Sequence, residues 1–168
     1  MSEPEAVAVH LEDMDVMSEA GLRSASAIGA VRFGPLHFGI AAEAHSRASK
    51  HGEARLRMES AFKALAHNHD MAFAAELHRM RAGLSLQAST DDRDAPEGDF
   101  RKAFQITRQH KSPSLHVRAA HDLARLLAER GERQQAADLL APIYAGFTEG
   151  SDTLDLKEAR NLLDELHA

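Results

Sequence analysis

The sequence predicts an all-α fold built from antiparallel helical hairpins, and three observations lead to this prediction. Apolar residues recur at three- and four-residue spacing along most of the chain, as they do on one face of an α-helix. Aromatic residues make up only 5% of the 168 residues, while Ala, Leu, Arg and Glu are abundant, which favours helix over sheet. No segment shows the apolar and polar alternation of a half-buried strand.

Glycines, prolines and polar clusters divide the chain into the expected helices. The N-terminal candidates are residues 5–20 and a weaker stretch over 22–34. Pro35 is expected in the first turn of the next helix, where its missing N–H is harmless, and Asp70 and Asp152 are expected to cap later helices. The remaining helices are expected at 36–48, 53–67, 71–87, 99–110, 114–130, 134–147 and from Asp152 to residue 167. An acidic, polar loop is expected over residues 88–98.

Small and large residues recur at matching offsets in successive hairpins, as in tetratricopeptide (TPR) repeats. The spacings from Ala42 to Ala82 and from Ala82 to Ala124 are 40 and 42 residues, longer than the ~34-residue TPR period. One unit places Ala42, His45, Ser49, Ala54, Met58 and Ala61 at the positions that define the repeat, and a later unit places Ala124, Leu127, Gly131, Ala136, Leu140 and Ile143 there. Ala82, Phe100 and Ala103 match a middle unit that contains the acidic loop. The prediction is a TPR-like antiparallel helical-hairpin solenoid of about three repeats plus a C-terminal capping helix. Residues 1–34 form an N-terminal helical segment with a partial repeat, and residues 35–168 form the TPR-like domain.

Several strings resemble one family in their order along the chain. They are LHVRAAHDLARLL at 115–127, LLAPIY at 139–144 and DTLDLKEARNLLDEL at 152–166, with AELHRM at 75–80 and the helix from Pro35 to His45 further upstream. They resemble the C-terminal TPR region of bacterial adenylate/guanylate cyclase-like and transcriptional-regulator-like predicted ATPases. The resemblance implies a regulatory region of a signalling protein. The family's nucleotide chemistry does not carry over, because this sequence contains no Gly-rich phosphate-binding loop.

The composition argues against several kinds of ligand and location. The net charge of −6 disfavours binding to a nucleic-acid backbone, and the absence of cysteine excludes disulfides and thiolate metal sites. The longest uncharged stretch, residues 33–42, is too short to cross a membrane, and the acidic start does not resemble a signal peptide. A cytoplasmic protein without membrane contact is therefore expected.

No catalytic group, cofactor or metal site is expected from the residue pattern. His67 and His69 form the densest histidine group, but alternate residues do not share a helix face, and no two histidines stand four residues apart. Solvent-facing turn residues explain them more simply. His78 is expected to have a structural role between helices. The sequence therefore predicts a protein that is not an enzyme.

The first helices of stacked hairpins line a concave surface, and this is where a partner is expected. Glu43, Arg79, Arg118, His121 and Arg125 are predicted to project into this groove. Converging arginines would suit an acidic peptide or a protein C-terminus. A solvated helical face with surface ion pairs explains the same residues equally well. Two further possibilities are a small-molecule or metal sensor that uses the groove His and Arg residues, and a homo-oligomer formed through the N-terminal end.

Overall fold

The computed structural model describes residues 33–68, 71–88 and 94–168, and these residues form seven helices and no strand. The expected all-α class is confirmed. The helices are α2 (Gly34–Arg47), α3 (His51–Asn68), α4 (Met71–Ala88), α5 (Asp94–Gln109), α6 (Pro113–Glu129), α7 (Arg133–Ala145) and α8 (Leu154–His167). The helices expected before residue 33 and the cap expected at Asp70 lie outside the described residues.

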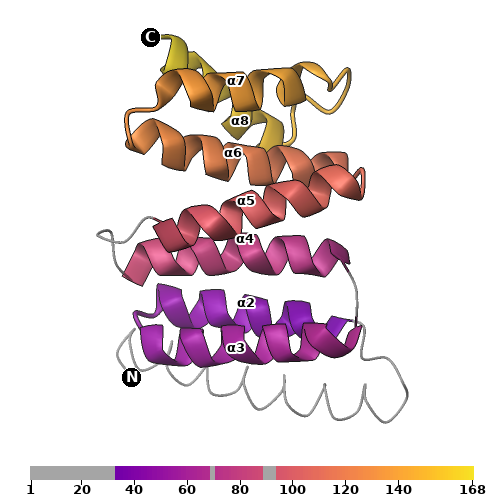
Figure 1. The fold of residues 1–168 in the computed structure, drawn as a ribbon, viewed down its shortest axis with the longest axis vertical. Coiled ribbons are helices and arrows are strands. Elements are labelled where there is room, and N and C mark those ends of the chain that lie inside the picture. The colour runs from indigo at the N-terminus through magenta and orange to yellow at the C-terminus, as the bar shows by residue number, and fades with distance from the viewer. Residues whose placement is uncertain (1–32, 69–70, 89–93) are drawn as a thin grey trace.

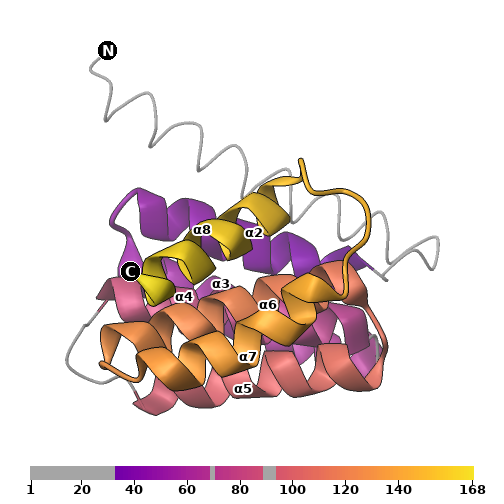
Figure 2. The ribbon, with the colours of Figure 1, turned by 90° about the horizontal axis from the view of Figure 1, so that it is seen from above.

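The helices pack in chain order. α2 packs on α3, α4 on α5, and α6 on α7, and the short connections make the members of each pair antiparallel. The first helices of the pairs also contact one another, α2 with α4 and α4 with α6, and α8 packs on both α6 and α7. The pairs are stacked along the long axis of the molecule (Figure 1), with α2 and α8 on one side and α5 and α7 on the opposite side (Figure 2).

Three connections end with the same hydrogen-bonded turn. In each, a residue just after the helix has a positive φ: Ser49 at 60°, Lys111 at 50° and Gly131 at 86°. The amide of the following residue donates to a carbonyl five residues earlier, as in Lys50 N–H to His45 O at 2.9 Å. This is the Schellman arrangement, which satisfies the last carbonyls of a helix and reverses the chain.

Prolines begin two of the helices. Pro35 lies in the first turn of α2, as the sequence predicts, and Pro113 lies in the first turn of α6. Other helix boundaries differ from those expected. α5 begins at Asp94, so residues 94–98 of the expected loop are helical; the residue before α8 is Thr153 rather than Asp152; and α3 runs from His51 to Asn68 instead of over 53–67.

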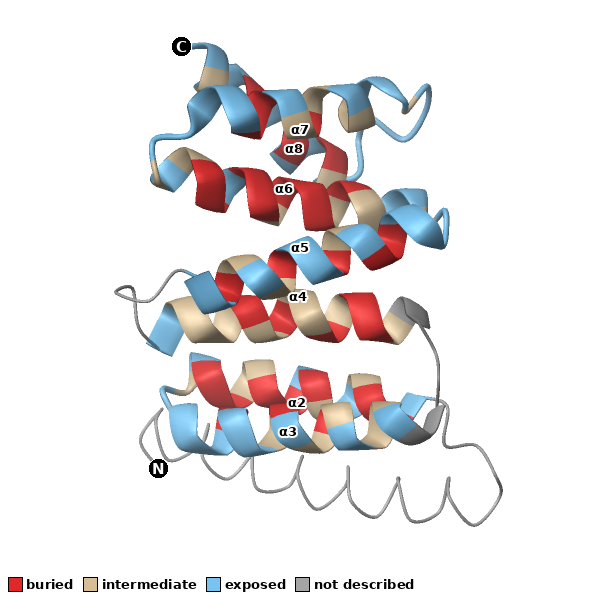
Figure 3. Cartoon of the chain, in the orientation of Figure 1, coloured by how far each residue is buried: buried red, intermediate tan, exposed pale blue. Residues whose placement is uncertain are grey.

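Buried apolar side chains form one large and two smaller clusters. The largest joins the C-terminal helices and centres on α6, along which buried residues are most continuous (Figure 3). A second joins α2, α3 and α4 through Ala42, Met58, Ala61, Leu77 and Met80. The third is a small contact between α4 and α5. The core is therefore distributed along the stack, with most of it at the C-terminal end.

Candidate functional site

The five predicted groove residues lie on first helices of the pairs. Glu43 is on α2, Arg79 on α4, and the other three on α6. The structure brings Arg79, Arg118, His121 and Arg125 to the contact between α4 and α6. Glu43 is not part of this group, and its recorded partner is Arg47 on its own helix, at 3.5 Å.

Arg79 is held by two carboxylates. Its guanidinium donates to Glu76, with contacts at 2.8 and 3.1 Å, and to Asp122 across the α4–α6 contact at 2.8 Å. Burial opposes the charged form of this arginine, yet its hydrogen bonds to Glu76 and Asp122 and the negative charges of these two acids outweigh burial and raise the Arg79 pKa above its usual value. The positive charge that the sequence assigns to the groove here is neutralised within the protein.

Arg118 connects three helices. It donates to Asp155 of α8 through Nη2 at 2.8 Å and Nε at 3.1 Å, and its Nη1 lies 3.7 Å from Glu76 of α4. The hydrogen bonding of Arg118 to the Asp155 carboxylate is the main reason that the pKa of Arg118 is raised, against the effect of burial. Together Glu76, Arg79, Arg118, Asp122 and Asp155 form what we call the polar network, which links α4, α6 and α8.

Arg125 differs from the other two arginines. Its side chain is exposed, and its recorded contact is with His121, whose Nε2 lies 3.4 Å from Arg125 Nη2. None of the carboxylates in the described residues forms an ion pair with it. His121 is buried and its Nδ1 lies 3.1 Å from Asp122 Oδ1, so it connects Arg125 to the polar network. Arg125 is therefore the groove arginine whose charge is not offset by an internal acid.

The three acids of the polar network were missed by sequence reasoning. Glu76 stands three residues before Arg79 on the same helix, a spacing that signals an ion pair. The contacts from Asp122 and Asp155 to arginines on other helices depend on how the helices are stacked, which the local pattern does not reveal. The charges of Arg79 and Arg118 are therefore compensated within the protein, and among the described residues only Arg125 keeps the free charge that the sequence predicts for all three.

A second polar group joins α4 to α5 and includes His78. His78 Nδ1 lies 2.8 Å from Asp99 Oδ1, and Arg81 donates to both oxygens of Asp99, at 2.5 and 2.7 Å. Burial opposes the ionised carboxylate, but the bonds to His78 and Arg81 dominate and lower the pKa of Asp99. The Arg81 guanidinium also lies 4.1 Å from the centre of the Phe62 ring, a cation–π contact.

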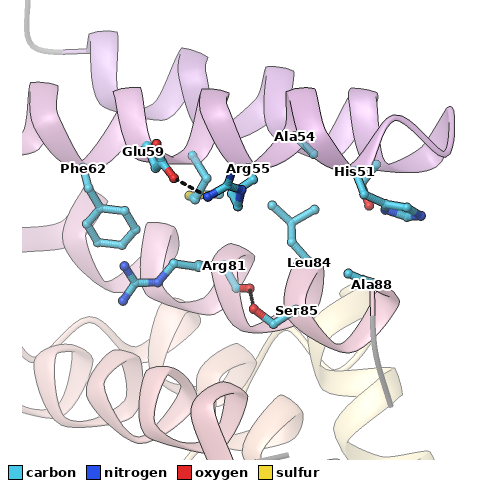
Figure 4. Close-up of a pocket in the computed structure, with 11 residues that line it drawn as sticks. His51, Ala54, Arg55, Glu59, Phe62, Arg81, Leu84, Ser85 and Ala88 are labelled. Carbon is cyan, nitrogen blue, oxygen red and sulfur yellow. Dashed lines mark hydrogen bonds and ion pairs between the residues drawn. The ribbon is translucent and has the colours of Figure 1, made fainter. Parts of the chain in front are cut away.

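A cavity of about 510 Å³ lies beside this group, between α3 and the C-terminal half of α4. Figure 4 shows Arg81 next to Phe62 at one end of it, with Leu84 pointing towards Ala54. Met58 adds to the apolar lining, and Arg55 pairs with Glu59 at the rim, 3.2 Å apart. The size is within the usual range of small-molecule sites. No local sequence pattern indicates this cavity, because its walls come from three helices.

No cluster of three or more potential metal ligands occurs in residues 33–68, 71–88 and 94–168. Across the same residues, no helix is both long enough and apolar enough to span a bilayer. Comparison with known proteins found no matching family model, curated protein or solved structure.

Proposed function

We propose that this chain is a TPR-type module that binds a protein or an acidic peptide and performs no catalysis itself. Two features support the TPR-like arrangement. The alanines at equivalent repeat positions, Ala42, Ala82 and Ala124, are each fully buried where first helices pack. Ser49 and Gly131, the equivalent turn residues of the first and last units, share the same left-handed conformation.

The observation that carries the binding proposal is the exposed charge on the face of the first helices. Among the described residues Arg125 has no acidic partner, and the Arg118 side chain, about two turns earlier on the same helix, keeps 38% of its surface exposed. Two acidic groups of an extended peptide match this spacing better than a single carboxylate does. Glu76, Asp122 and Asp155 hold the neighbouring arginine and histidine side chains in place, which lowers the ordering cost of binding.

The wider setting is proposed from the sequence strings described above. They point to a bacterial signalling system of the cyclase or ATPase type, in the cytoplasm, with a protein partner and neither nucleic acid nor membrane as ligand. Phe33, Ile40 and Leu56 are large apolar residues exposed on the first helical pair. Exposed apolar side chains of this kind favour self-association, which would take place through the N-terminal end of the array.

The proposal is tested with a fluorescently labelled nonapeptide rich in Glu and Asp, titrated with the protein while fluorescence anisotropy is recorded. We expect saturable binding that Arg125→Glu weakens by about tenfold or more, because reversing an unpaired charge adds repulsion to the lost contact. Arg79→Gln is not a suitable probe, because loss of the guanidinium would leave Glu76 and Asp122 without their ion-pair partner.

The matched control is Arg160→Glu, which makes the same charge change at an exposed position on α8 next to Asp164. It is expected to bind the peptide as the wild type does, apart from a small loss from the change in net charge. Equal weakening by Arg160→Glu and Arg125→Glu would mean that only the overall charge matters, and the groove would be abandoned.

A small-molecule sensor is the second candidate, and the cavity between α3 and α4 is the observation in its favour. Thermal unfolding with added nucleotides or Zn²⁺ separates the candidates, since a ligand that binds the folded state raises the melting temperature. An unchanged melting temperature with all of them would count against the sensor.

A further inference from the structure

A second cavity, of about 550 Å³, lies at the edge where α5 turns into α6 and where α7 ends. These segments lie at the same edge of the molecule, on the right in Figure 1. The apolar part of the lining is Pro113 from α6, Pro142 and Ile143 from α7, and Phe147 just after α7. This cavity is separate from the polar network and from the cavity beside Phe62.

Two cations border this cavity. Arg108 lies in the last turn of α5 and Lys111 in the turn that follows, and both residues are exposed. Within the part of the chain that the structure describes, neither side chain forms a hydrogen bond or ion pair with a carboxylate, in contrast to Arg79, Arg81 and Arg118. One acid, Glu149, also borders the cavity, so the local balance is one net positive charge.

His116 does not add to this charge. Its ring stacks on Phe104 with centroids 4.6 Å apart, and its Nδ1 lies 2.9 Å from Thr107 Oγ1. Burial is the main cause that lowers the His116 pKa, and the charge of Arg108 lowers it further. The imidazole is therefore neutral at neutral pH, and the positive potential comes from Arg108 and Lys111.

The start of α6 also borders the cavity, through Ser112 and Pro113. Ser112 precedes the helix and makes no side-chain capping bond, and Pro113 has no N–H. The N-terminal end of a helix carries a partial positive charge, so this end of α6 adds to the positive potential of Arg108 and Lys111.

Lys111 stands where glycine would be the natural choice. Its φ of 50° is a conformation that residues with a side chain rarely adopt. Gly131 occupies the corresponding position in the next connection, between α6 and α7. A lysine at this position is unfavourable for folding, and unfavourable conformations tend to persist at functional sites. The strain is consistent with a side chain retained for binding.

We propose that this cavity binds an organic carboxylate, with its apolar body against Ile143 and Phe147 and its carboxylate at Arg108 and Lys111. The proposal is independent of the peptide groove, because the two sites share no residue. The carboxylate could belong to a free acid or to the C-terminus of a peptide, and the experiment below separates these sources.

The probe is octanoate, titrated into the full chain by calorimetry, with octanamide as an uncharged ligand of the same shape. We expect octanoate to bind and octanamide to bind about tenfold more weakly. Only the carboxylate of octanoate carries a charge, so only octanoate can form strong charge-assisted hydrogen bonds with the two cations. Arg108→Gln and Lys111→Gly should each weaken octanoate binding and leave octanamide binding unchanged.

Lys111→Gly also separates binding from folding. It should raise the melting temperature while it weakens octanoate binding, whereas Ser49→Gly, the equivalent change in the α2–α3 turn, should raise the melting temperature and leave binding intact. Loss of binding therefore cannot be attributed to misfolding.

Two results would overturn the proposal: no octanoate binding at millimolar concentration, or equal affinity for octanoate and octanamide. To distinguish a free acid from a peptide C-terminus as the natural ligand, a short peptide ending in Phe with a free carboxylate is compared with its C-terminal amide. Tighter binding of the peptide acid than of octanoate assigns the site to chain termini, and the reverse assigns it to free acids.

Discussion

At the scale of single residues, the backbone at three turns requires the same left-handed conformation, and the residue types differ. Gly131 adopts it without a side chain, whereas Ser49 and Lys111 adopt it with one. A Cβ atom added at Gly131 would meet nothing within 4 Å, so any cost of a side chain there comes from the backbone and not from crowding.

Reciprocal substitutions test this account. Ser49→Gly is expected to stabilise the protein, and Gly131→Ser to destabilise it, each by about 1 kcal/mol, because L-residues pay that penalty in the left-handed region. Urea unfolding followed by circular dichroism gives both free energies. If both variants changed the free energy of unfolding in the same direction, the left-handed conformation would not be the cause of the effects at these two positions.

The pH dependence of stability follows from Asp99. Its pKa is lowered in the folded state, so its contribution is present above the unfolded value of roughly 3.9 and is lost as the pH falls through the folded value. We expect the free energy of unfolding to fall steeply below about pH 4. Asp99→Asn should cost about 1.5 to 3 kcal/mol at pH 7, as charge-assisted bonds to Arg81 and His78 are lost.

The measurement is urea unfolding at a series of pH values from 7 to 3. In Asp99→Asn the decline at acid pH should be shallower but not absent, because the pKa of Asp122 is also lowered, by its bonds to His121 and Arg79 against the opposing effect of burial. An identical slope in the variant and the wild type would refute the role given to Asp99.

At the scale of elements, the start of α5 shows what a local pattern misses. Pro96 and Gly98 predict a loop, yet both lie in the helix, and Pro96 is buried in its first turn, where a missing N–H is tolerated. Asp94 and Glu97 also pair with Arg130 at the end of α6. The longer helices were predictable because their apolar stripes are continuous, whereas this boundary depends on contacts with a distant helix.

The crossing of α2 and α4 gives a prediction at this scale. Gly39 lies at the contact, and a Cβ there would come 2.7 Å from Leu77 Cδ2 and 3.2 Å from Met80 Sδ. Leu77 is fully buried and has little room to move. Gly39→Ala should therefore destabilise the protein by about 1 to 3 kcal/mol despite alanine's higher helix propensity.

Gly83→Ala is the matched control for Gly39→Ala, because Gly83 is also inside a helix but a Cβ there would meet nothing within 4 Å. Helix propensity alone then predicts stabilisation by up to about 1 kcal/mol. Thermal unfolding of both variants checks the pair. Stabilisation by Gly39→Ala would mean that the helices separate easily at this crossing.

At the scale of the whole molecule, the sequence predicted the order of helices and the face on which Arg79, Arg118 and Arg125 lie. It did not predict which of these charges remains free. That outcome depends on Asp122 and Asp155 reaching across from neighbouring helices, so it emerges only when the stack is assembled. Both cavities are missed for the same reason, since their walls come from separate segments.

The stacked arrangement also predicts how stability varies along the chain. α6 contacts α4, α5, α7 and α8 and supplies many residues of the largest core cluster, whereas α2 and α3 share a smaller one. In an array whose units contact mainly their neighbours, local opening follows the local core. We expect amides of α6 to exchange with solvent at least about tenfold more slowly than those of α2 and α3.

Hydrogen exchange followed by mass spectrometry measures this gradient, and two buried leucines provide matched perturbations. Leu77→Ala removes side-chain volume from the α2–α4 cluster and Leu140→Ala removes it from the α6–α8 cluster, at about 2 to 5 kcal/mol each. Leu77→Ala should accelerate exchange in α2, α3 and α4 more than in α7 and α8, and Leu140→Ala should do the opposite. Uniform acceleration by either variant would show that the chain unfolds as a single cooperative unit, because a local loss of packing would then be felt equally at both ends of the stack.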